Sequence, residues 1–474
     1  MAGSLLGAAA GPLLRTSRAA DAARPNILFL LSDDQSYATM SSTGNPFLKT
    51  PHLDRIGREG VLFTNAFVAM SLCAPSRACF LTGQYPHTNG IHGNQIRWNQ
   101  QLATLPTILH ENGWRTAHIG KFHMDGDDRR QPGYDFWSAQ INQGSYVNPR
   151  KNVNGEWRDL AGYDTDIVTE QAIDFMRARK NGQPFCAWLG YKAAHAPFTP
   201  APGFEKFLAE REFKPPASFF LDDEGKPERV RRKSQHDSTT TRRAQRKGGA
   251  LTLEQWAERE RNYYRALMGL EVNVGRLLNF LDEEKLAENT IVVFAADNGF
   301  FHGEHGLHGK LEAYEEALRI PMMARFPGRI PAGKRLDDFV ANVDLAPTML
   351  DFLRIRPPRP MQGRSWRPLA TGESTDFNGR EDFLYSMWAP GASAVEKPTV
   401  KALRTDRNKL ILNLHPREID ELYDIREDPQ EMKNLALEKG NRELVVTLTR
   451  RLLARMRELE DPAAPSVEQL LGGG

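Results

Sequence analysis

Two apolar segments, far apart in the chain, each have the length of one buried strand and each end in adjacent oxygen-bearing side chains. Residues 25–32, PNILFLLS, are followed by Asp33 and Asp34, and residues 290–296, TIVVFAA, are followed by Asp297 and Asn298. Apolar runs of this length are typical of central strands in a parallel sheet that helices cover on both faces. The chain is therefore expected to have an α/β fold.

The polar residues after these strands predict a metal site. Open α/β sheets bind ligands at the edge where their parallel strands end. Two adjacent carboxylates such as Asp33 and Asp34 repel each other there unless a cation joins them, and Asp297 and Asn298 would add two more oxygen atoms. Oxygen ligands favour Ca²⁺ or Mg²⁺ over Zn²⁺. The alternative for the first pair is a helix N-cap beside a solvated aspartate.

Helices and strands are expected to alternate between the two segments. Helical patterns cover residues 51–59, 104–112 and 166–180, and strand patterns cover residues 114–119 and 185–190. Lys121 and His123 follow the first of these strands and His195 follows the second, so all three are expected at the same sheet edge. For His195 a structural role before Pro197 is the alternative.

Cys73 begins a short motif with Pro75, Ser76 and Arg77. Proline suits the first turn of a helix, and the free N–H groups of that turn attract an anion. The spacing indicates a nucleophile at the start of a helix with a guanidinium beside it, although a plain turn into a helix has the same pattern. The cysteines, Cys73, Cys79 and Cys186, are odd in number and lack metal-ligand spacing, which argues against a disulfide framework.

Two segments resemble the signatures of a known family. Cys73-x-Pro75-Ser76-Arg77 with residues 81–86, LTGQYP, resembles the first signature of the type I sulfatases. Residues 113–123, GWRTAHIGKFH, resemble the second, with Trp114 where Tyr or Val is more usual. The likeness extends over residues 25–436.

The resemblance implies an alkaline-phosphatase-like fold, in which helices sandwich a large, mostly parallel sheet and a smaller C-terminal α+β domain carries an antiparallel sheet. It also implies that a formylglycine-generating or sulfatase-maturing enzyme oxidises Cys73 to formylglycine. One Ca²⁺ or Mg²⁺ ion is then expected on Asp33, Asp34, Cys73, Asp297 and Asn298. The catalytic residues implied by the family are Cys73, Arg77, Lys121, His123, His195 and Lys310.

The implied reaction is hydrolysis of a sulfate monoester. The formylglycine hydrate would attack sulfur, His195 with Lys310 would protonate the departing alcohol, and His123 would assist loss of the second hydroxyl proton. Long loops and a basic insertion favour a sulfated carbohydrate over a small lipid or choline ester. The alternatives are a phosphonate monoester or phosphodiester hydrolase and, in another class, a non-catalytic anion-binding protein with unmodified Cys73.

The insertion at residues 213–251 contains nine lysines or arginines and two acidic residues within residues 226–247. It predicts either a solvated loop, mobile in part, or a rim that attracts polyanionic substrate. RNA binding lacks the interleaved aromatic residues it would need. His302, His305 and His308 are spaced for a zinc hypothesis, but the surrounding glycines disfavour a continuous helix there.

The remaining predictions concern organisation and location. We expect a truncated signal-like or disordered segment at 1–24, a catalytic domain at 25–360, a C-terminal subdomain at 361–462 and a loose tail at 463–474. Strands at 400–405 and 409–414 should form a hairpin, and a leucine stripe from Leu444 to Met456 should cover the sheet.

Nothing in the sequence has the length and hydropathy of a membrane span, and the net charge of +2 points to no nucleic-acid partner. A signal-like start predicts a periplasmic or secreted protein, and a cytoplasmic one if that segment is not a signal. The sequence makes no prediction of oligomeric state. The expected partners are a sulfated small molecule or saccharide and the maturation enzyme.

Overall fold

The computed structural model describes residues 24–124, 129–180, 182–220, 225–233, 251–358, 361–377, 380–387 and 399–472. The signal-like segment predicted at 1–24 therefore lies outside the described residues except for Arg24, and so does the part of the basic insertion at 234–250. Within the described ranges, no helix combines the length and the apolar character needed to cross a membrane.

A ten-stranded sheet forms the centre of the protein, in the order β13-β2-β12-β9-β1-β8-β4-β5-β6-β7. The five strands from β9 to β5 are parallel, whereas β12 pairs antiparallel with both its neighbours and β6 and β7 extend the other edge antiparallel. The strands are β1 Asn26–Ser32, β2 Val61–Phe63, β4 Arg115–Lys121, β5 Phe136–Gln140, β6 Arg150–Val153, β7 Glu156–Asp159, β8 Phe185–Gly190, β9 Thr290–Ala296, β12 Met322–Arg325 and β13 Lys334–Leu336.

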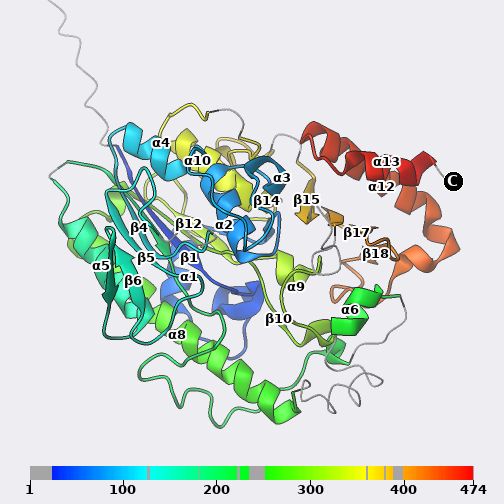
Figure 1. The fold of residues 1–474 in the computed structure, drawn as a ribbon, viewed down its shortest axis with the longest axis horizontal. Helices are drawn as coiled ribbons and strands as arrows, with labels where there is room; N and C mark the ends of the chain where they lie inside the picture. Colours follow the sequence, from blue (N-terminus) through cyan, green and yellow to red (C-terminus); the bar gives the residue numbers. More distant parts are fainter. Residues whose placement is uncertain are drawn as a thin grey trace, which may run out of the picture.

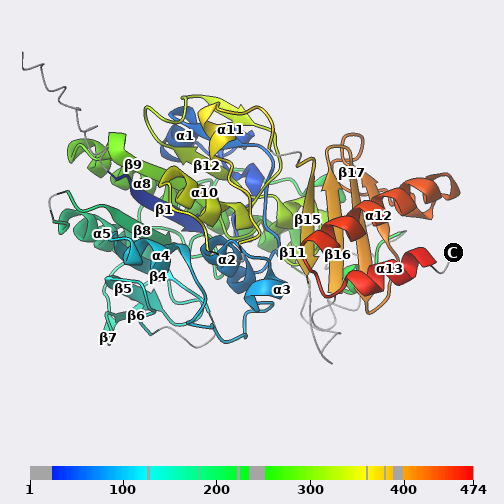
Figure 2. The same cartoon turned by 90° about the horizontal axis from the view of Figure 1, so that it is seen from above.

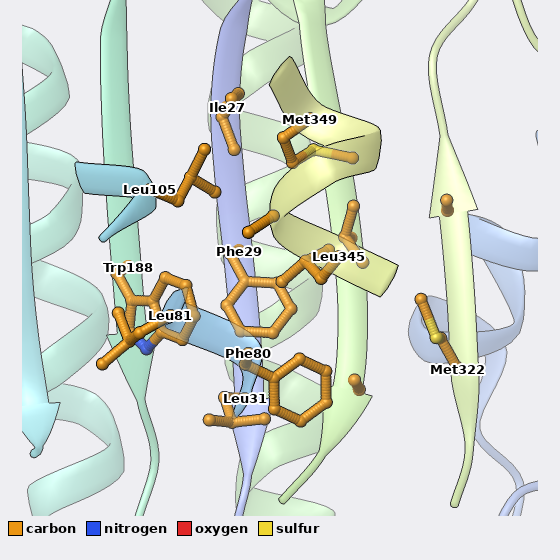
Figure 3. Packing of buried hydrophobic residues seen from close by; sticks show 14 of the residues in the cluster. Ile27, Phe29, Leu31, Phe80, Leu81, Leu105, Trp188, Met322, Leu345 and Met349 are labelled. Atoms are coloured by element: carbon orange, nitrogen blue, oxygen red, sulfur yellow. The ribbon is translucent and has the colours of Figure 1, made fainter. Parts of the chain in front are cut away.

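Helices cover both faces of this sheet (Figure 1). Alternate residues of β1 point to opposite sides: Ile27, Phe29 and Leu31 pack in one core cluster, and Leu28 and Leu30 pack in another. Figure 3 shows the first side, where Phe29 lies near Phe80 of one helix and Leu345 of another. The first side holds α2 Cys73–Thr82, α4 Leu105–Glu111 and α10 Leu345–Phe352, and the second holds α1 Pro51–Arg58, α5 Asp164–Arg177 and α8 Leu253–Glu283.

A second, antiparallel sheet lies beside the first, with two C-terminal helices against it (Figure 2). The predicted hairpin forms its central pair, and the two sheets together confirm the predicted fold class. Its elements are β15 Asp382–Met387, β16 Thr399–Thr405, β17 Asn408–His415, β18 Glu421–Asp424 and α12 Arg442–Glu458. Short elements elsewhere are β3 Ala66–Phe67, β10 Phe301–His302, β11 His308–Gly309, β14 Val340–Ala341, α3 Pro86–Asn89, α9 Glu315–Leu318 and α11 Arg367–Thr371.

The prediction of a loose tail at residues 463–474 is wrong for residues 463–472, the part that the structure describes. Ala464–Gly472 forms helix α13, which packs beside α12. Ala464 and Val467 are buried in the same core cluster as the second sheet. This short segment has too few apolar residues to show a helical period in the sequence. Its helix depends on apolar contacts that form only in the folded protein.

The basic insertion also differs from a solvated loop in its described part. Phe219 is fully buried against Trp256, and Val230 on helix α6 Glu228–Lys233 is fully buried in the cluster of the second sheet. Lys226 is only 2% exposed, and Arg229 pairs with Glu312. The insertion therefore folds back onto the protein, because its scattered apolar side chains and its cations have fixed partners there.

Candidate active site

The parallel strands bring three polar segments to one edge of the main sheet. Asp33 and Asp34 follow β1, Asp297 and Asn298 follow β9, and Lys121 ends β4. The pairing register shows that β1, β8 and β9 end side by side: Ser32 lies opposite Ala296 at the end of β9, and Leu31 lies opposite Gly190 at the end of β8. All five polar side chains are nearly or fully buried. Residues predicted from separate strand ends thus share one site.

Three carboxylates and one amide meet at its centre. Asp297 Oδ1 accepts from the Asp34 backbone N–H at 3.1 Å, and Asn298 Nδ2 donates to Asp34 Oδ1 at 2.7 Å. Burial and repulsion from Asp33 raise the pKa of Asp297 well above its usual value. Asn298 Oδ1 is buried without a hydrogen-bond partner among the described residues. Converging acids beside an orphaned amide oxygen fit a hard divalent cation.

Cys73 lies at the first turn of α2, directly beside these acids. Its Sγ is 3.7 Å from Asp33 Oδ1 and accepts from Lys310 Nζ at 2.9 Å. Ligand atoms of Asp33, Asp34, Cys73 and His195 all lie within 4.8 Å of one another. Pro75 fits the first turn of α2, and Gly83, with φ of 65°, ends the helix in the left-handed region. The motif therefore places residue 73 at the centre of the oxygen-rich group.

The three cysteines differ in their surroundings, although all three are buried and free. Burial raises the pKa of the Cys79 and Cys186 thiols. Burial also opposes ionisation of Cys73, but Lys121 and Lys310 outweigh it and lower the pKa of that thiol. Cys79 lies in the next turn of the helix, 4.0 Å from Asn89 Nδ2 and away from the acids. Only Cys73 among the cysteines has the environment of a reactive group.

Arg77 links three elements of the site. Its Nε donates to Asp297 Oδ2 at 2.9 Å, its Nη1 donates to the carbonyl of Lys121 at 2.7 Å, and its Nη2 lies 3.7 Å from Asp33 Oδ2. The side chain is only 2% exposed. A guanidinium held by a buried fork of this kind keeps a fixed direction, so α2, β4 and β9 are locked together around residue 73.

Two lysines contact the acids. Lys121 Nζ donates to Asp33 Oδ2, and Lys310 Nζ donates to Asp34 Oδ1. Burial opposes ionisation of Asp33, but Lys121, His195 and Arg77 together hold its pKa well below the usual value. For Lys310 burial is outweighed by Asp34 and Cys73, which raise its pKa well above normal. Both ammonium groups are therefore held against the acids around residue 73.

The two predicted histidines differ in protonation. His195 Nδ1 donates to the carbonyl of Ala196 at 2.6 Å, which leaves Nε2 3.7 Å from Asp34 Oδ2. Burial opposes protonation of His195, but Asp33 and Asp34 raise its pKa. Burial and Lys121 lower the pKa of His123 to about 2. One imidazole is thus poised to donate a proton and the other to accept one.

Sequence reasoning missed two residues that support these groups. Gln143 accepts from Lys121 Nζ and donates to His123 Nε2 at 3.2 Å. Lys192 Nζ donates to the Gln143 carbonyl at 3.0 Å, and burial lowers its pKa to about 8. Lys192 lies two residues after the end of β8, so the strand-end argument used for His195 could have found it. Gln143 lies in a loop after β5 without any pattern that marks it.

The histidine-rich loop does not gather its first two histidines around one point. His302 Nδ1 lies 2.7 Å from Glu260 Oε2, and its Nε2 lies 2.8 Å from Ser36 Oγ. His305 is fully buried and stacks on the Tyr314 ring, 4.3 Å between centroids. Their partners differ, and each has a structural contact of its own. The zinc hypothesis therefore gains no support from these two side chains.

Comparison with known proteins decides the family. A family model described as Sulfatase matches residues 25–355, which include every candidate site residue. The chain belongs to the sulfatase family. The sulfatase also matches a model described as N-sulphoglucosamine sulphohydrolase, C-terminal, over residues 303–458. Hydrolysis of a sulfate ester is the activity of this chain, as the sequence signatures implied.

Individual relatives agree with the family. This sulfatase is 34% identical over 465 residues to an N-acetylglucosamine-6-O-sulfatase of Bacteroides thetaiotaomicron, covering 87% of this chain and 82% of the relative. A solved structure described as a complex with its substrate D-glucosamine-2-N,6-O-disulfate is similar with a TM-score of 0.85 and 31% identity, covering 93% of this chain and 99% of the other.

The fold is shared more widely than the activity. The phosphonate monoester hydrolase of Agrobacterium radiobacter is similar to this sulfatase with a TM-score of 0.74, covering 92% of this chain and 96% of the other. Its identity to this chain is 19%, so it shows the fold alone.

Proposed function

We propose that this sulfatase removes the 6-O-sulfate of a glucosamine-type sugar within a sulfated saccharide. The proposal is supported by the N-acetylglucosamine-6-O-sulfatase relative and by the similar structure whose substrate is D-glucosamine-2-N,6-O-disulfate. The observation that carries the chemistry is the gathering of ligand atoms of Asp33, Asp34, Cys73 and His195 within 4.8 Å of one another, with Lys121 bound to Asp33 and Lys310 bound to Asp34. A sulfate ester is an anion, and this positive field suits it.

Cys73 is proposed to become formylglycine through a dedicated maturation enzyme. The modified residue would supply a hydrated aldehyde whose hydroxyl attacks sulfur. Two observations favour residue 73 over the other cysteines: its place at the first turn of α2 and its contact with Lys310. The two lysines and the arginine around residue 73 would suit anion binding by an unmodified protein equally well, so sulfate release that is lost in Cys73→Ala is the result that separates the two functions.

A single Ca²⁺ or Mg²⁺ ion would be held by Asp33, Asp34, Asp297 and Asn298 together with position 73. The residues fit such an ion, since the buried Asn298 Oδ1 lacks a partner and three carboxylates converge beside it. Bound there, the ion would neutralise these carboxylates and stabilise negative charge on the sulfate group. Arg77 would keep Asp33 and Asp297 oriented toward it.

The proton transfers are assigned to the two histidines. His195, held by the Ala196 carbonyl, would give the proton of Nε2 to the departing sugar hydroxyl, with Lys310 close by. His123 would accept a proton from position 73 in the second half of the reaction, steadied by Gln143. Lys121 would hold the sulfate oxygens while Asp33 keeps its ammonium group in place.

An export route is the proposed location. The apolar and small residues of 1–24 support a signal-like segment, and a sulfated saccharide is an extracellular type of substrate. The protein would then act in the periplasm or outside the cell.

The function is tested by measuring product release from matched esters. We expect sulfate release from N-acetylglucosamine 6-O-sulfate and from glucosamine-2-N,6-O-disulfate, with much weaker turnover of a phosphonate monoester and an aryl phosphodiester. Faster turnover of the phosphorus esters would favour the phosphonate hydrolase alternative. Release of sulfate from position 3 with none from position 6 would overturn the proposed substrate.

A further inference from the structure

Arg259 of α8 lies beside the active site without an assigned role. Its guanidinium carbon is 5.3 Å from the ring centroid of Phe198 and 5.9 Å from that of Phe300. Phe198 follows His195 by three residues, and Phe300 follows Asn298 by two. The two rings contact each other at 5.8 Å. Arg259 is therefore held over an aromatic pair that belongs to two of the catalytic loops.

The same helix connects Arg259 to the metal-site acids. Tyr263, one turn further along α8, stacks on Phe300 at 5.9 Å and donates its hydroxyl to the Asp34 carbonyl at 2.9 Å. Ser36 Oγ donates to the Phe300 carbonyl at 2.8 Å. These contacts fix the backbone on both sides of the aromatic pair. The position of Arg259 relative to the site is thus set by a rigid helix and a buried tyrosine.

Arg259 is half-buried yet has no ion pair or hydrogen bond to any described residue. The nearby carboxylates are engaged elsewhere: Glu260 is 2.7 Å from His302, and Asp34 accepts from Lys310. Burial lowers the pKa of the Arg259 guanidinium more than Glu260 and Asp34 raise it. The guanidinium nitrogens are not sealed from solvent, so their unused donors stay open to an anionic ligand.

We propose that Arg259 binds a second anionic group of the saccharide substrate, a sulfate or a carboxylate next to the ester that is cleaved. A guanidinium presents paired N–H donors that match the oxygens of either group. The aromatic pair holds its plane in place, which reduces the entropy lost when an anion binds. Arg259 thereby makes the enzyme prefer sugars that carry two anionic groups. The inference rests on the proposed saccharide substrate.

The test compares three substrates. N-acetylglucosamine 6-O-sulfate lacks a second anion, glucosamine-2-N,6-O-disulfate carries one on the same sugar, and a disaccharide of 6-sulfated N-acetylglucosamine and a hexuronate carries one on the neighbour. Arg259→Gln should lower kcat/KM about 10- to 100-fold for the disulfate or the disaccharide and change it little for the monosulfate. The affected substrate identifies the source of the anion. Arg259→Lys, which keeps the charge but loses the fork, should lose less.

Arg261→Gln is the matched control. Arg261 lies on the same helix but pairs with Glu258 at 3.1 Å and faces the Phe213 ring, so its loss should affect the three sugars equally and little. An equal loss on all three sugars in Arg259→Gln would overturn the inference and leave the proposed function standing. A wild-type enzyme that releases sulfate from none of them would overturn both.

Discussion

Two buried groups of charges occupy this protein, and they are built differently. The first, which we name the catalytic cluster after its proposed role, consists of Asp33, Asp34, Asp297, Arg77, Lys121 and Lys310. The junction cluster consists of Lys226, Glu315, Lys409, Glu421 and Glu431, where α9 meets the second sheet. Both are nearly or fully shielded from solvent, Lys310 and Glu315 being the most exposed, each at 12% of its side chain.

In the junction cluster every carboxylate has a cation or a hydroxyl as partner. Lys409 Nζ lies 2.8 Å from both Glu315 and Glu431, and Tyr314 and Tyr423 donate to Glu421 at 2.6 and 2.7 Å. In the catalytic cluster the ligand atoms of Asp33 and Asp34 lie within 4.8 Å of those of Cys73 and His195, and no other such group occurs among the described residues. Buried charge alone therefore does not mark a functional site. Potential metal ligands gathered around one point do.

The largest difference should come from removing one carboxylate of the catalytic cluster. Asp297→Asn keeps the shape of the side chain but removes a charge that the proposed cation needs, so kcat/KM should fall about 10³-fold or more together with metal content. The metal-free fold should hardly weaken, because burial and Asp33 raise the pKa of Asp297 so that it resists ionisation there. Sulfate release, elemental analysis and urea unfolding measure the three effects.

Asp282→Asn is the control for this change. Asp282 lies near the end of helix α8 and pairs with Arg55 at 2.7 Å and with Arg325 at 3.7 Å, neither of which belongs to the candidate active site. It should leave kcat/KM and metal content as in the wild type. Full activity in Asp297→Asn would remove the distinction between the two clusters.

The junction cluster should show the opposite pattern. Lys226→Met leaves the neighbouring Glu421 and Glu431 without a buried cation that now donates to Tyr423 at 2.9 Å, and should lower the free energy of unfolding by about 3 kcal/mol. The kcat of the molecules that remain folded should change far less than in Asp297→Asn. Lys439→Met, at an exposed position, should change neither quantity. A Lys226 variant as stable as the wild type would contradict this view of the junction.

The pH dependence of stability sharpens the comparison further. Burial, with repulsion from Glu315 and Glu316 against the attraction of Lys409, raises the pKa of Glu431 to about 7. A raised pKa in the folded state contributes stability below the unfolded pKa of about 4.5 and loses it as pH rises toward 7. Glu431→Gln should reduce the slope of unfolding free energy across this window by up to about 1.4 kcal/mol per pH unit. Identical slopes for variant and wild type would exclude Glu431 as the source.

The smallest effect is expected on the surface of the insertion. Lys226, Arg229 and Lys233 are committed to partners, which leaves Arg231 and Arg232 exposed on α6, the latter already paired with Glu228. Replacing both by serine should lower kcat/KM for a sulfated polysaccharide by about 3-fold or less, and the loss should vanish at high salt. A small aryl sulfate should be turned over as before. A loss that persists at 1 M salt would indicate direct contact instead of long-range attraction.

The residues that share the site could be predicted in large part, because the end of a buried parallel strand can be recognised in a sequence. The apolar runs before Asp33 and Asp297 have a defined length, so the residues that follow them share one edge of the sheet. Lys121, His123 and His195 follow from the same rule. The spacing of Cys73 and Arg77 is local to one helix, and the structure keeps it as helix α2.

The remainder depends on contacts that no local pattern encodes. Gln143 reaches Lys121 from a loop, and Arg229 finds Glu312 across 83 residues of chain. Helix α13 is stabilised by its packing against α12. Its sequence alone shows no helical period, so the sequence predicts a loose tail there. The conformation of these segments depends on tertiary contacts, and the pattern of charge or hydropathy along the sequence does not predict such contacts.

The central claim is that position 73, set among converging acids and lysines, performs sulfate ester hydrolysis. The most direct measurement is sulfate release from N-acetylglucosamine 6-O-sulfate by the wild type and by Cys73→Ala, both produced with an active maturation enzyme. The wild type should turn the sugar over, and Cys73→Ala should lose at least about 10³-fold in kcat while remaining folded, since alanine cannot be oxidised to the aldehyde. Cys79→Ala, which alters only packing, should keep most of the activity. A Cys73→Ala enzyme with most of its wild-type kcat would contradict the account.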